Sequence, residues 1–366
     1  MCEVEIYNQI GNGRNCPSYQ PTAVYKGRLR NSIEFVAIKL IDIQRQDEVS
    51  NAVDLFKNLP HHDNIVDFID CAENGGNENK NNSGKINFNS SINSRCRGQT
   101  NQIRLIVEYC PGGTLMDLLE RDVSLPESII QIFASDILSA LLHLHKNGII
   151  YRDISPRNIL LDECGLIKLG DFCRSGRIDE PIDFSKSIVD IEMLQYMAPE
   201  LLDEDSCPSF SSDFYALGCI MYQMATGHSP FSFPFANDGY DVDEMKLIEM
   251  IRDYNPVSQG NFIPDVSNDF NDLLIKLLDK DPYKRPNWLE LVSHPFWKDT
   301  LTKERLDNAF VDFDKTYKLL PKQPKFEKRR NQNQKPIQNN DKNQNKNNNS
   351  QDSINFNRSR RKSFTK

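Results

Sequence analysis

The sequence lacks the cysteine pattern of a disulfide or zinc framework. Its nine cysteines form an odd number and include no C-x-x-C pair. Small secreted domains and structural zinc sites depend on evenly paired or closely spaced cysteines. We therefore expect reduced thiols in an intracellular, cytoplasmic chain.

Long apolar runs are also missing. No stretch matches the roughly 18 apolar residues of a membrane-spanning helix. The first residues, MCEVEIYNQIGNG, lack the apolar core of a signal peptide. The sequence therefore predicts no membrane insertion. With 38% hydrophobic and 26% charged residues in a length of 366, it has the composition of a globular protein with one large domain or two lobes.

Acidic residues outnumber basic ones except near the C-terminus. Residues 321–366 hold thirteen Lys and Arg against three acidic residues, although the whole chain has a net charge of −8. This Asn-, Gln- and Lys-rich tail has too little apolar content to offset the entropy of ordering, so we expect disorder. A basic tail can contact nucleic acid or another acidic surface. A disordered tail that only keeps the protein soluble explains the same composition and is favoured, so nucleic acid is not the expected partner.

The apolar pattern changes character along the chain. The runs VYKGRL, FVAIKLI, NIVDFID and IRLIVEYC predict strands, with one helix at about 48–58. An Asn-rich insert at about 73–102 is expected to be a disordered loop between the last two strands. After Pro111, helical spacing predicts helices in PESIIQIFASDILSALLHLHKNG, DFYALGCIMYQMATG and NDFNDLLIKLLDK, the second of them buried. The prediction is an α+β chain with lobes at 1–110 and 111–299, an extension at 300–320 and the tail.

Eight short motifs follow one another in a fixed order. They are IGNG, FVAIK, EYCPGG, YRDISPRN, GDFC, APE, DFYALG and KRP. In this order and spacing they resemble a eukaryotic protein kinase from about Tyr7 to Trp297. The resemblance implies a bilobal kinase fold, ATP and Mg²⁺ as cofactors, and a protein as substrate or docking partner.

The same resemblance assigns roles to polar residues. Lys39 is expected to bind the ATP phosphates, and Asp171 and Asn158 to hold magnesium. Asp153 is expected to orient the substrate hydroxyl and accept its proton. Asp and Asn are also common in turns and caps, and lysine on exposed strands. The ordered motifs disfavour that alternative.

Further residues are expected around the nucleotide. Gly11 and Gly13 would let backbone N–H groups approach the phosphates, although an ordinary loop glycine is an equal alternative. The remaining expected contacts are apolar side chains, which by default belong to a core, and backbone groups of the segment that joins the lobes. They are Val24, Ala37 and Leu160, backbone groups of Glu108 and Cys110, and Val107 at the gatekeeper position.

Four further matching residues concern support rather than catalysis. By resemblance, Glu200 and Arg285 form a buried ion pair, and Asp213 braces the backbone of the catalytic loop. Arg152 is expected to meet Ser185 or Ser187 if either is phosphorylated, although exposed loop serines are the favoured explanation of those two residues.

The catalytic loop, YRDISPRN, departs from the family pattern. Tyr151 replaces a histidine and Ser155 replaces a lysine, and Met193 stands where a threonine is usual. Arg157 lies four residues after Asp153, where tyrosine kinases place an arginine for the same electrostatic role. We expect Arg157 to replace the missing charge, with a surface arginine as the alternative.

Other departures concern the phosphate site. No third glycine follows Gly13 at the family spacing, and Cys173 replaces the glycine of the magnesium motif. The glutamate that pairs with the strand lysine falls on Ala52 or Val53, while Glu48 and Asp54 lie elsewhere around the helix. Lys39 therefore lacks its usual partner or uses another.

The phrase DISPRNILL, with SSDFYALGCIMYQMATG and the missing helix glutamate, narrows the resemblance to the Unc-51-like pseudokinase branch and its Fused and Runkel relatives. That branch tends to lose catalytic residues and is associated with microtubules and cilia. Two hypotheses follow. The first is a serine/threonine protein kinase with weak or conditional activity. The second is a catalytically impaired nucleotide-binding scaffold that docks a partner.

Overall fold

The computed structural model describes residues 4–12, 22–30, 32–74, 102–178, 180, 191–203, 207–231, 244–258 and 262–297. All of these belong to one compact unit, Met1–Pro324. Gly13, the two serines at 185 and 187, most of the Asn-rich insert, the extension at 300–320 and the basic tail lie outside the described residues.

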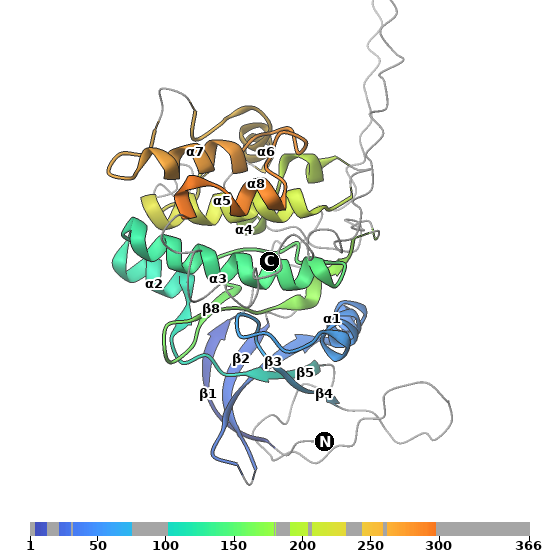
Figure 1. Ribbon diagram of the computed structural model, residues 1–366. Helices are drawn as coiled ribbons and strands as arrows, with labels where there is room; N and C mark the ends of the chain where they lie inside the picture. The colour runs from blue at the N-terminus through green and yellow to red at the C-terminus, as the bar shows by residue number, and fades with distance from the viewer. Residues whose placement is uncertain are drawn as a thin grey trace, which may run out of the picture. The chain divides into compact units, whose positions relative to one another are not determined.

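The first part of the chain forms a five-stranded antiparallel sheet (Figure 1). Its order is β1 (Val4–Asn12), β2 (Ala23–Leu29), β3 (Phe35–Asp42), β5 (Gln102–Glu108) and β4 (Phe68–Asn74). The strands on either side of the Asn-rich insert, β4 and β5, pair with each other. The prediction of adjacent strands is confirmed, and each strand reaches a residue or two into the predicted insert.

Strand β3 shows why this sheet presents side chains to two sides. Val36, Ile38 and Leu40 are buried and pack with Ile106 in a small core on one face. Because side chains alternate along a strand, Ala37 and Lys39 lie on the other face, where both are half-buried. The sequence FVAIKLI thus buries one face and leaves the lysine on the face that carries the candidate site.

Helix α1 (Gln46–Asn58) follows β3 after the short 3₁₀ helix η1 (Ile43–Arg45), and its apolar residues pack into the main core. The predicted helix at about 48–58 is confirmed within two residues. The buried residues Val49, Ala52, Val53 and Leu55 recur at helical spacing. Packing of this apolar stripe, rather than intrinsic propensity, holds α1 against the rest of the protein.

Helices make up most of the second part of the chain (Figure 1). They are α2 (Leu115–Asp122), α3 (Glu127–Lys146), α4 (Ile191–Leu194), α5 (Phe210–Thr226), α6 (Glu244–Asp253), α7 (Asn268–Leu277) and α8 (Trp288–Val292). Short strands β6 (Gly113–Thr114), β8 (Ile159–Leu161) and β9 (Ile167–Leu169) form one sheet, and β7 (Ile149–Ile150) and β10 (Gly176–Arg177) another. The predicted bilobal α+β kinase fold is confirmed.

The two longest helices begin and end where their sequences indicate. Helix α3 starts after Pro126 and ends before Gly148, which has a φ of 71°. Helix α5 starts with a capping box between Ser209 and Ser212 and ends at Gly227, with a φ of 84°. Nearly all of α5 is buried, as its uninterrupted apolar character predicts.

Helix α3 corrects the expectation that no segment has the length and hydropathy of a membrane span. Among the described residues it passes that test, with a mean hydropathy of 1.3 over its most apolar window, of which 67% is buried. The periodic polar residues within α3 hid this from a search for uninterrupted apolar runs. Its burial between other elements is typical of a core helix.

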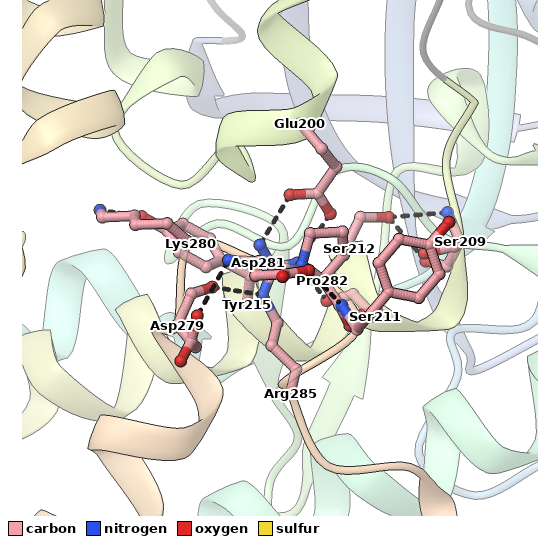
Figure 2. Close-up of polar contacts among 11 residues, drawn as sticks. Glu200, Ser209, Ser211, Ser212, Tyr215, Asp279, Lys280, Asp281, Pro282 and Arg285 are labelled. Carbon is pink, nitrogen blue, oxygen red and sulfur yellow. Dashed lines mark hydrogen bonds and ion pairs between the residues drawn. The ribbon is translucent and has the colours of Figure 1, made fainter. Parts of the chain in front are cut away.

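A buried ion pair joins two distant segments of the helical part (Figure 2). The Arg285 guanidinium donates to both carboxylate oxygens of Glu200, over 2.7 and 2.6 Å, and also to the carbonyls of Asp279 and Ser211. The arginine side chain is fully buried. This pair confirms the expectation from sequence. Removing one partner of such a pair leaves an uncompensated buried charge, which costs about 3–5 kcal/mol.

A second buried network surrounds Asp213 at the start of α5. Its carboxylate accepts from the backbone N–H groups of Tyr151 and Arg152, both at 2.9 Å, so the predicted brace of the catalytic loop is confirmed. It also lies 2.9 Å from Nε2 of His145, and Trp288 Nε1 donates to Nδ1 of that ring. Because the indole can only donate, His145 is neutral and carries its proton on Nε2.

Burial of histidines predicts a loss of stability in mild acid. Burial lowers the pKa of His62 to about 4, helped by neighbouring His143, and burial also lowers the pKa values of His143, His145 and His294. The unfolded chain, with histidine pKa values near about 6.5, binds more protons between these limits. The free energy of unfolding should therefore fall as pH drops from about 6.5 to about 4.

Thermal unfolding at a series of pH values measures this effect. The variant His62→Asn should flatten part of the slope, because asparagine keeps an acceptor for the Asn64 N–H that His62 Nδ1 now accepts. The raised pKa of exposed His61 acts in the opposite direction and stays in both proteins. A midpoint that is constant or rises on acidification across this window would contradict the prediction.

Candidate active site

Lys39 and Asp171 form an ion pair at the centre of the candidate site. The Lys39 ammonium on β3 contacts the Asp171 carboxylate, which lies just before the 3₁₀ helix η2 (Phe172–Arg174). Burial alone would raise the pKa of Asp171. The charge and hydrogen bond of Lys39, and the charge of Arg45, outweigh burial and hold that pKa well below its usual range. The carboxylate is therefore a stable anion facing a fixed cation.

Helix α1 does not supply the lysine's usual partner. The two candidate positions, Ala52 and Val53, are buried in the apolar core. Glu48 accepts two hydrogen bonds from Arg45, at 3.0 and 2.6 Å, and Asp54 is exposed. The expectation that Lys39 lacks a glutamate on this helix agrees with the structure, and the partner that it uses is Asp171.

The catalytic loop positions Asp153 and Asn158 through its own backbone. The Asn158 side-chain amide donates to the Asp153 carbonyl at 2.9 Å, and the Asn158 N–H donates to the Ser155 carbonyl at 3.0 Å. Asp153 and Asn158 are both buried. The Asn158 carbonyl in turn accepts from Gly170 N–H at 2.9 Å, which places the loop beside the residue preceding Asp171. The Lys39–Asp171 pair is thus connected to the loop of Asp153 and Asn158 through the backbone of Gly170.

This donor set suits magnesium held together with a triphosphate. Asp171 offers a carboxylate, and Asn158 keeps its amide oxygen for a ligand because its nitrogen binds the loop. Magnesium commonly takes one or two protein oxygens and completes its shell with substrate phosphates and water. Within the described part of the chain, no group of three or more His, Cys, Asp or Glu could hold a metal ion. The two residues therefore fit Mg²⁺ only as a partner of nucleotide.

Tyr151, which replaces the family histidine, has a structural role. Its ring is fully buried, and its hydroxyl donates to the Gly170 carbonyl. The ring packs edge-on against Phe172, with centroids 5.2 Å apart, and Phe172 packs against Phe56 of α1 at 4.6 Å. Phe56 stacks on Phe68 of β4 at 5.6 Å. This aromatic column, Tyr151–Phe172–Phe56–Phe68, connects the catalytic loop to the sheet.

Cys173 fits where the family has a glycine. Its thiol is buried, and burial followed by the charge of Asp171 raises the pKa of that thiol. Its backbone N–H donates to Asp171 Oδ1 at 3.4 Å. Cys173 is not among the described residues with positive φ, whereas Asp171 has a φ of 52°. The turn therefore tolerates a side chain at 173 and places its unusual backbone conformation at Asp171.

The expected adenine-site residues lie on neighbouring elements. Val24 on β2, Ala37 on β3 and Leu160 on β8 are all half-buried apolar side chains, which leaves part of each accessible to a ligand. Glu108 ends β5, and its carboxylate pairs with Lys168 of β9 at 3.0 Å. Burial raises the pKa of the Cys110 thiol to about 12, so this side chain is a neutral thiol. Their contacts with adenine stay predictions.

Gly11 lies in β1 and pairs with Val24 of β2. A Cβ atom added to Gly11 would meet Val24 Cβ at 3.9 Å, an ordinary contact. The protein's own packing therefore does not require glycine there. Its predicted role at the phosphates depends on ligand approach alone, and the second glycine of the motif, Gly13, is outside the described residues.

Arginines lie around the catalytic loop, and the serines expected to meet Arg152 are outside the described residues. Arg157 is exposed, and its Nε lies 2.5 Å from Glu192 of α4. Arg174, which sequence reasoning missed, has its Nε 3.7 Å from the Asp153 carboxylate. The Arg152 guanidinium donates to the carbonyls of Arg177 and Glu180. The only sequence signal for Arg174 was its position immediately after the DFC motif.

Comparison with known proteins places this geometry in a family. Residues 4–297 match the family model described as "Protein kinase domain". The chain is 36% identical over 315 residues to the serine/threonine-protein kinase RUNKEL of Arabidopsis thaliana and 32% identical over 333 residues to ULK4 of Mus musculus, with 85% of this chain covered in each case. Mitogen-activated protein kinase kinase kinase 2 of Arabidopsis thaliana is 30% identical over 285 residues, or 75% of this chain.

These relatives are longer proteins. The matched region is 20% of RUNKEL, 22% of ULK4 and 38% of the third relative. The chain therefore spans about a fifth of the first two proteins. The predicted resemblance to the Unc-51-like and Runkel branch is confirmed.

The aromatic column predicts a specific cost for removing the Tyr151 hydroxyl. Tyr151→Phe keeps the ring against Phe172 and loses only the hydrogen bond to Gly170, so we expect a loss of about 0.5–1.5 kcal/mol in the free energy of unfolding. Tyr151→Ala also removes the ring contacts and should cost about 3–5 kcal/mol. Urea denaturation, with midpoint and slope both fitted, measures the two changes. Equal effects of both substitutions would show that the hydroxyl alone matters.

Proposed function

The chain belongs to the protein kinase family, and from that premise we propose that it transfers the γ-phosphate of ATP to a serine or threonine hydroxyl of a protein. Its relatives RUNKEL and ULK4 carry the description serine/threonine-protein kinase. The observation that supports activity in this chain is the proximity of Lys39, Asp171, Asn158 and Asp153. Lys39 contacts Asp171, the N–H of adjacent Gly170 donates to the Asn158 carbonyl, and the Asn158 amide donates to the main-chain carbonyl of Asp153. These four residues supply the cation, two metal-binding oxygens and base that phosphoryl transfer requires.

Each residue has a task in that reaction. Lys39 exchanges its contact with Asp171 for the phosphates of ATP, and Asp171 and Asn158 then hold Mg²⁺, which neutralises phosphate charge when bound. Asp153 orients the substrate hydroxyl and accepts its proton. A bond forms between the hydroxyl oxygen and the γ-phosphorus, the bond from γ-phosphorus to the bridging oxygen breaks, and ADP leaves.

The Lys39–Asp171 contact also explains why activity would be weak or conditional. In active members of the family, a helix glutamate holds the lysine, whereas here the lysine binds the metal ligand itself. Nucleotide binding must separate this partly buried pair, which costs free energy that a preorganised site does not spend. Slow turnover, or activity that needs a partner to stabilise the separated state, is the expected consequence.

A second candidate function rests on the same observation. If Asp171 stays with Lys39, the protein is a nucleotide-binding scaffold that docks a partner without transferring phosphate. The apolar residues Ala52 and Val53 at the glutamate positions support this reading. We propose a cytoplasmic location for either function, with cytoskeletal or ciliary association suggested by the resemblance to the Runkel branch, and a protein as the partner.

Phosphate transfer to a generic protein substrate tests the first function. With wild type active, Asp153→Asn should lower kcat by about 10²–10⁴-fold, the usual contribution of a catalytic base. Lys39→Met should also reduce kcat strongly, because it removes the phosphate-binding cation. The matched controls Asp63→Asn and Lys57→Met change exposed residues outside the site and should behave as wild type. Equal background incorporation by wild type, Asp153→Asn and Lys39→Met would favour the scaffold.

Thermal unfolding with ligands tests the metal assignment separately. ATP should raise the midpoint, because a ligand that binds only the native state stabilises it. Mg²⁺ added with ATP should raise it further, whereas Mg²⁺ alone should have little effect. Asp171→Asn should abolish the increment due to Mg²⁺. Stabilisation by ATP that is identical with and without Mg²⁺ in wild type would contradict the roles of Asp171 and Asn158.

A further inference from the structure

The catalytic loop lacks the family lysine near Asp153, and the guanidinium of neighbouring Arg152 is bound to the carbonyls of Arg177 and Glu180. Ser155, two residues after Asp153, stands where the family has a lysine, and its side chain is short, uncharged and 1% exposed. Phosphoryl transfer builds negative charge on the three equatorial oxygens of the moving group. A cation near the base would stabilise this charge.

Arg157 is poorly placed to be that cation. Its side chain is 45% exposed, and its Nε contacts Glu192 at 2.5 Å. This carboxylate neutralises much of the arginine's charge and turns it toward α4. The exposed position adds solvent screening, which weakens any influence on the transferred group.

Arg174, which comes from the segment after β9, brings a positive charge close to Asp153. Its Nε lies 3.7 Å from Asp153 Oδ2, and the two side chains are 13% and 5% exposed. The separation is longer than a hydrogen bond, so this contact is one between charges. Reduced solvent around the pair makes it stronger than a surface ion pair. A guanidinium also has a planar set of N–H donors that matches phosphate oxygens.

The backbone on both sides of Arg174 is fixed. Two residues before Arg174, the Phe172 ring lies between Tyr151 and Phe56. The following Ser175 donates through its N–H to the Phe172 carbonyl and through its hydroxyl to the Tyr151 carbonyl. The Asn51 amide of α1 donates to the Ser175 carbonyl at 2.7 Å. Contacts with Tyr151, Phe56 and Asn51 therefore hold the turn that carries Arg174, which limits where its guanidinium can lie.

We propose that Arg174 is a catalytic residue that replaces the missing loop lysine and contacts the γ-phosphoryl group during its transfer from ATP to the substrate hydroxyl. It stabilises the charge on that group while Asp153 receives the hydroxyl proton and ADP leaves. The inference deepens the proposed function and rests on it. It assigns to the residue after the DFC motif a role that the sequence pattern suggested for Arg157.

Steady-state kinetics of Arg174→Met test this role. Loss of a cation that contacts the γ-phosphoryl group should lower kcat by about 100-fold and should also raise KM for ATP. Adding Ser155→Lys to Arg174→Met restores a cation at the family position, and at least about a tenfold recovery of kcat is expected. The control Arg177→Met removes an exposed arginine three residues further along and should match wild type. If Arg174→Met folds poorly, Arg174→Gln takes its place in the same comparison.

A kcat for Arg174→Met equal to or above that of wild type would overturn the proposal, since Arg174 would then be neutral or would restrain Asp153. Failure of Ser155→Lys to recover any activity would overturn it as well, because the role would not be one of charge.

A second readout separates this inference from the proposed function. If wild type shows no Asp153-dependent transfer, the proposed function fails, and binding decides the role of Arg174. Thermal stabilisation by ATP should exceed that by ADP in wild type, lose this excess in Arg174→Met and regain it when Ser155→Lys is added. An excess that persists in Arg174→Met would show that the arginine does not contact the γ-phosphate.

Discussion

The ion pair between Lys39 and Asp171 is the contact on which the rest of the site depends. It joins β3 of the sheet to the segment after β9, so it fixes the position of the lysine relative to that of the aspartate. Both partners are largely shielded from solvent, which makes the attraction substantial. The same pair occupies the lysine and the aspartate to which we assign phosphate and metal binding, so under that assignment it stabilises the site and opposes ligand binding at once.

The departures from the family pattern lie next to one another in space. Tyr151 supplies a hydroxyl to Gly170 and a ring to Phe172, and Cys173 fits a turn whose positive φ falls on Asp171. Arg174 extends from the same turn to Asp153. The changed residues pack against the retained catalytic residues and leave them connected.

Much of the fold was predictable from local patterns. Alternation in FVAIKLI predicted which strand residues are buried, and proline and glycine at the ends of α3 predicted its limits. The buried pair of Glu200 and Arg285 and the brace by Asp213 followed from ordered motifs. The partner of Lys39 did not follow, because an ion pair between residues 132 positions apart depends on how lobes pack and not on spacing in sequence.

By itself, the sequence determined the elements, their order, the family and the residue types available for chemistry, because periodicity, caps and motifs are local properties of the chain. Tertiary structure alone decided which charge meets which. In the structure Arg157 contacts Glu192 and Arg174 lies near Asp153, although Arg157 is the arginine closer to Asp153 in the sequence. Electrostatic interaction falls with distance through space and with exposure to solvent, and neither quantity is written in the order of residues.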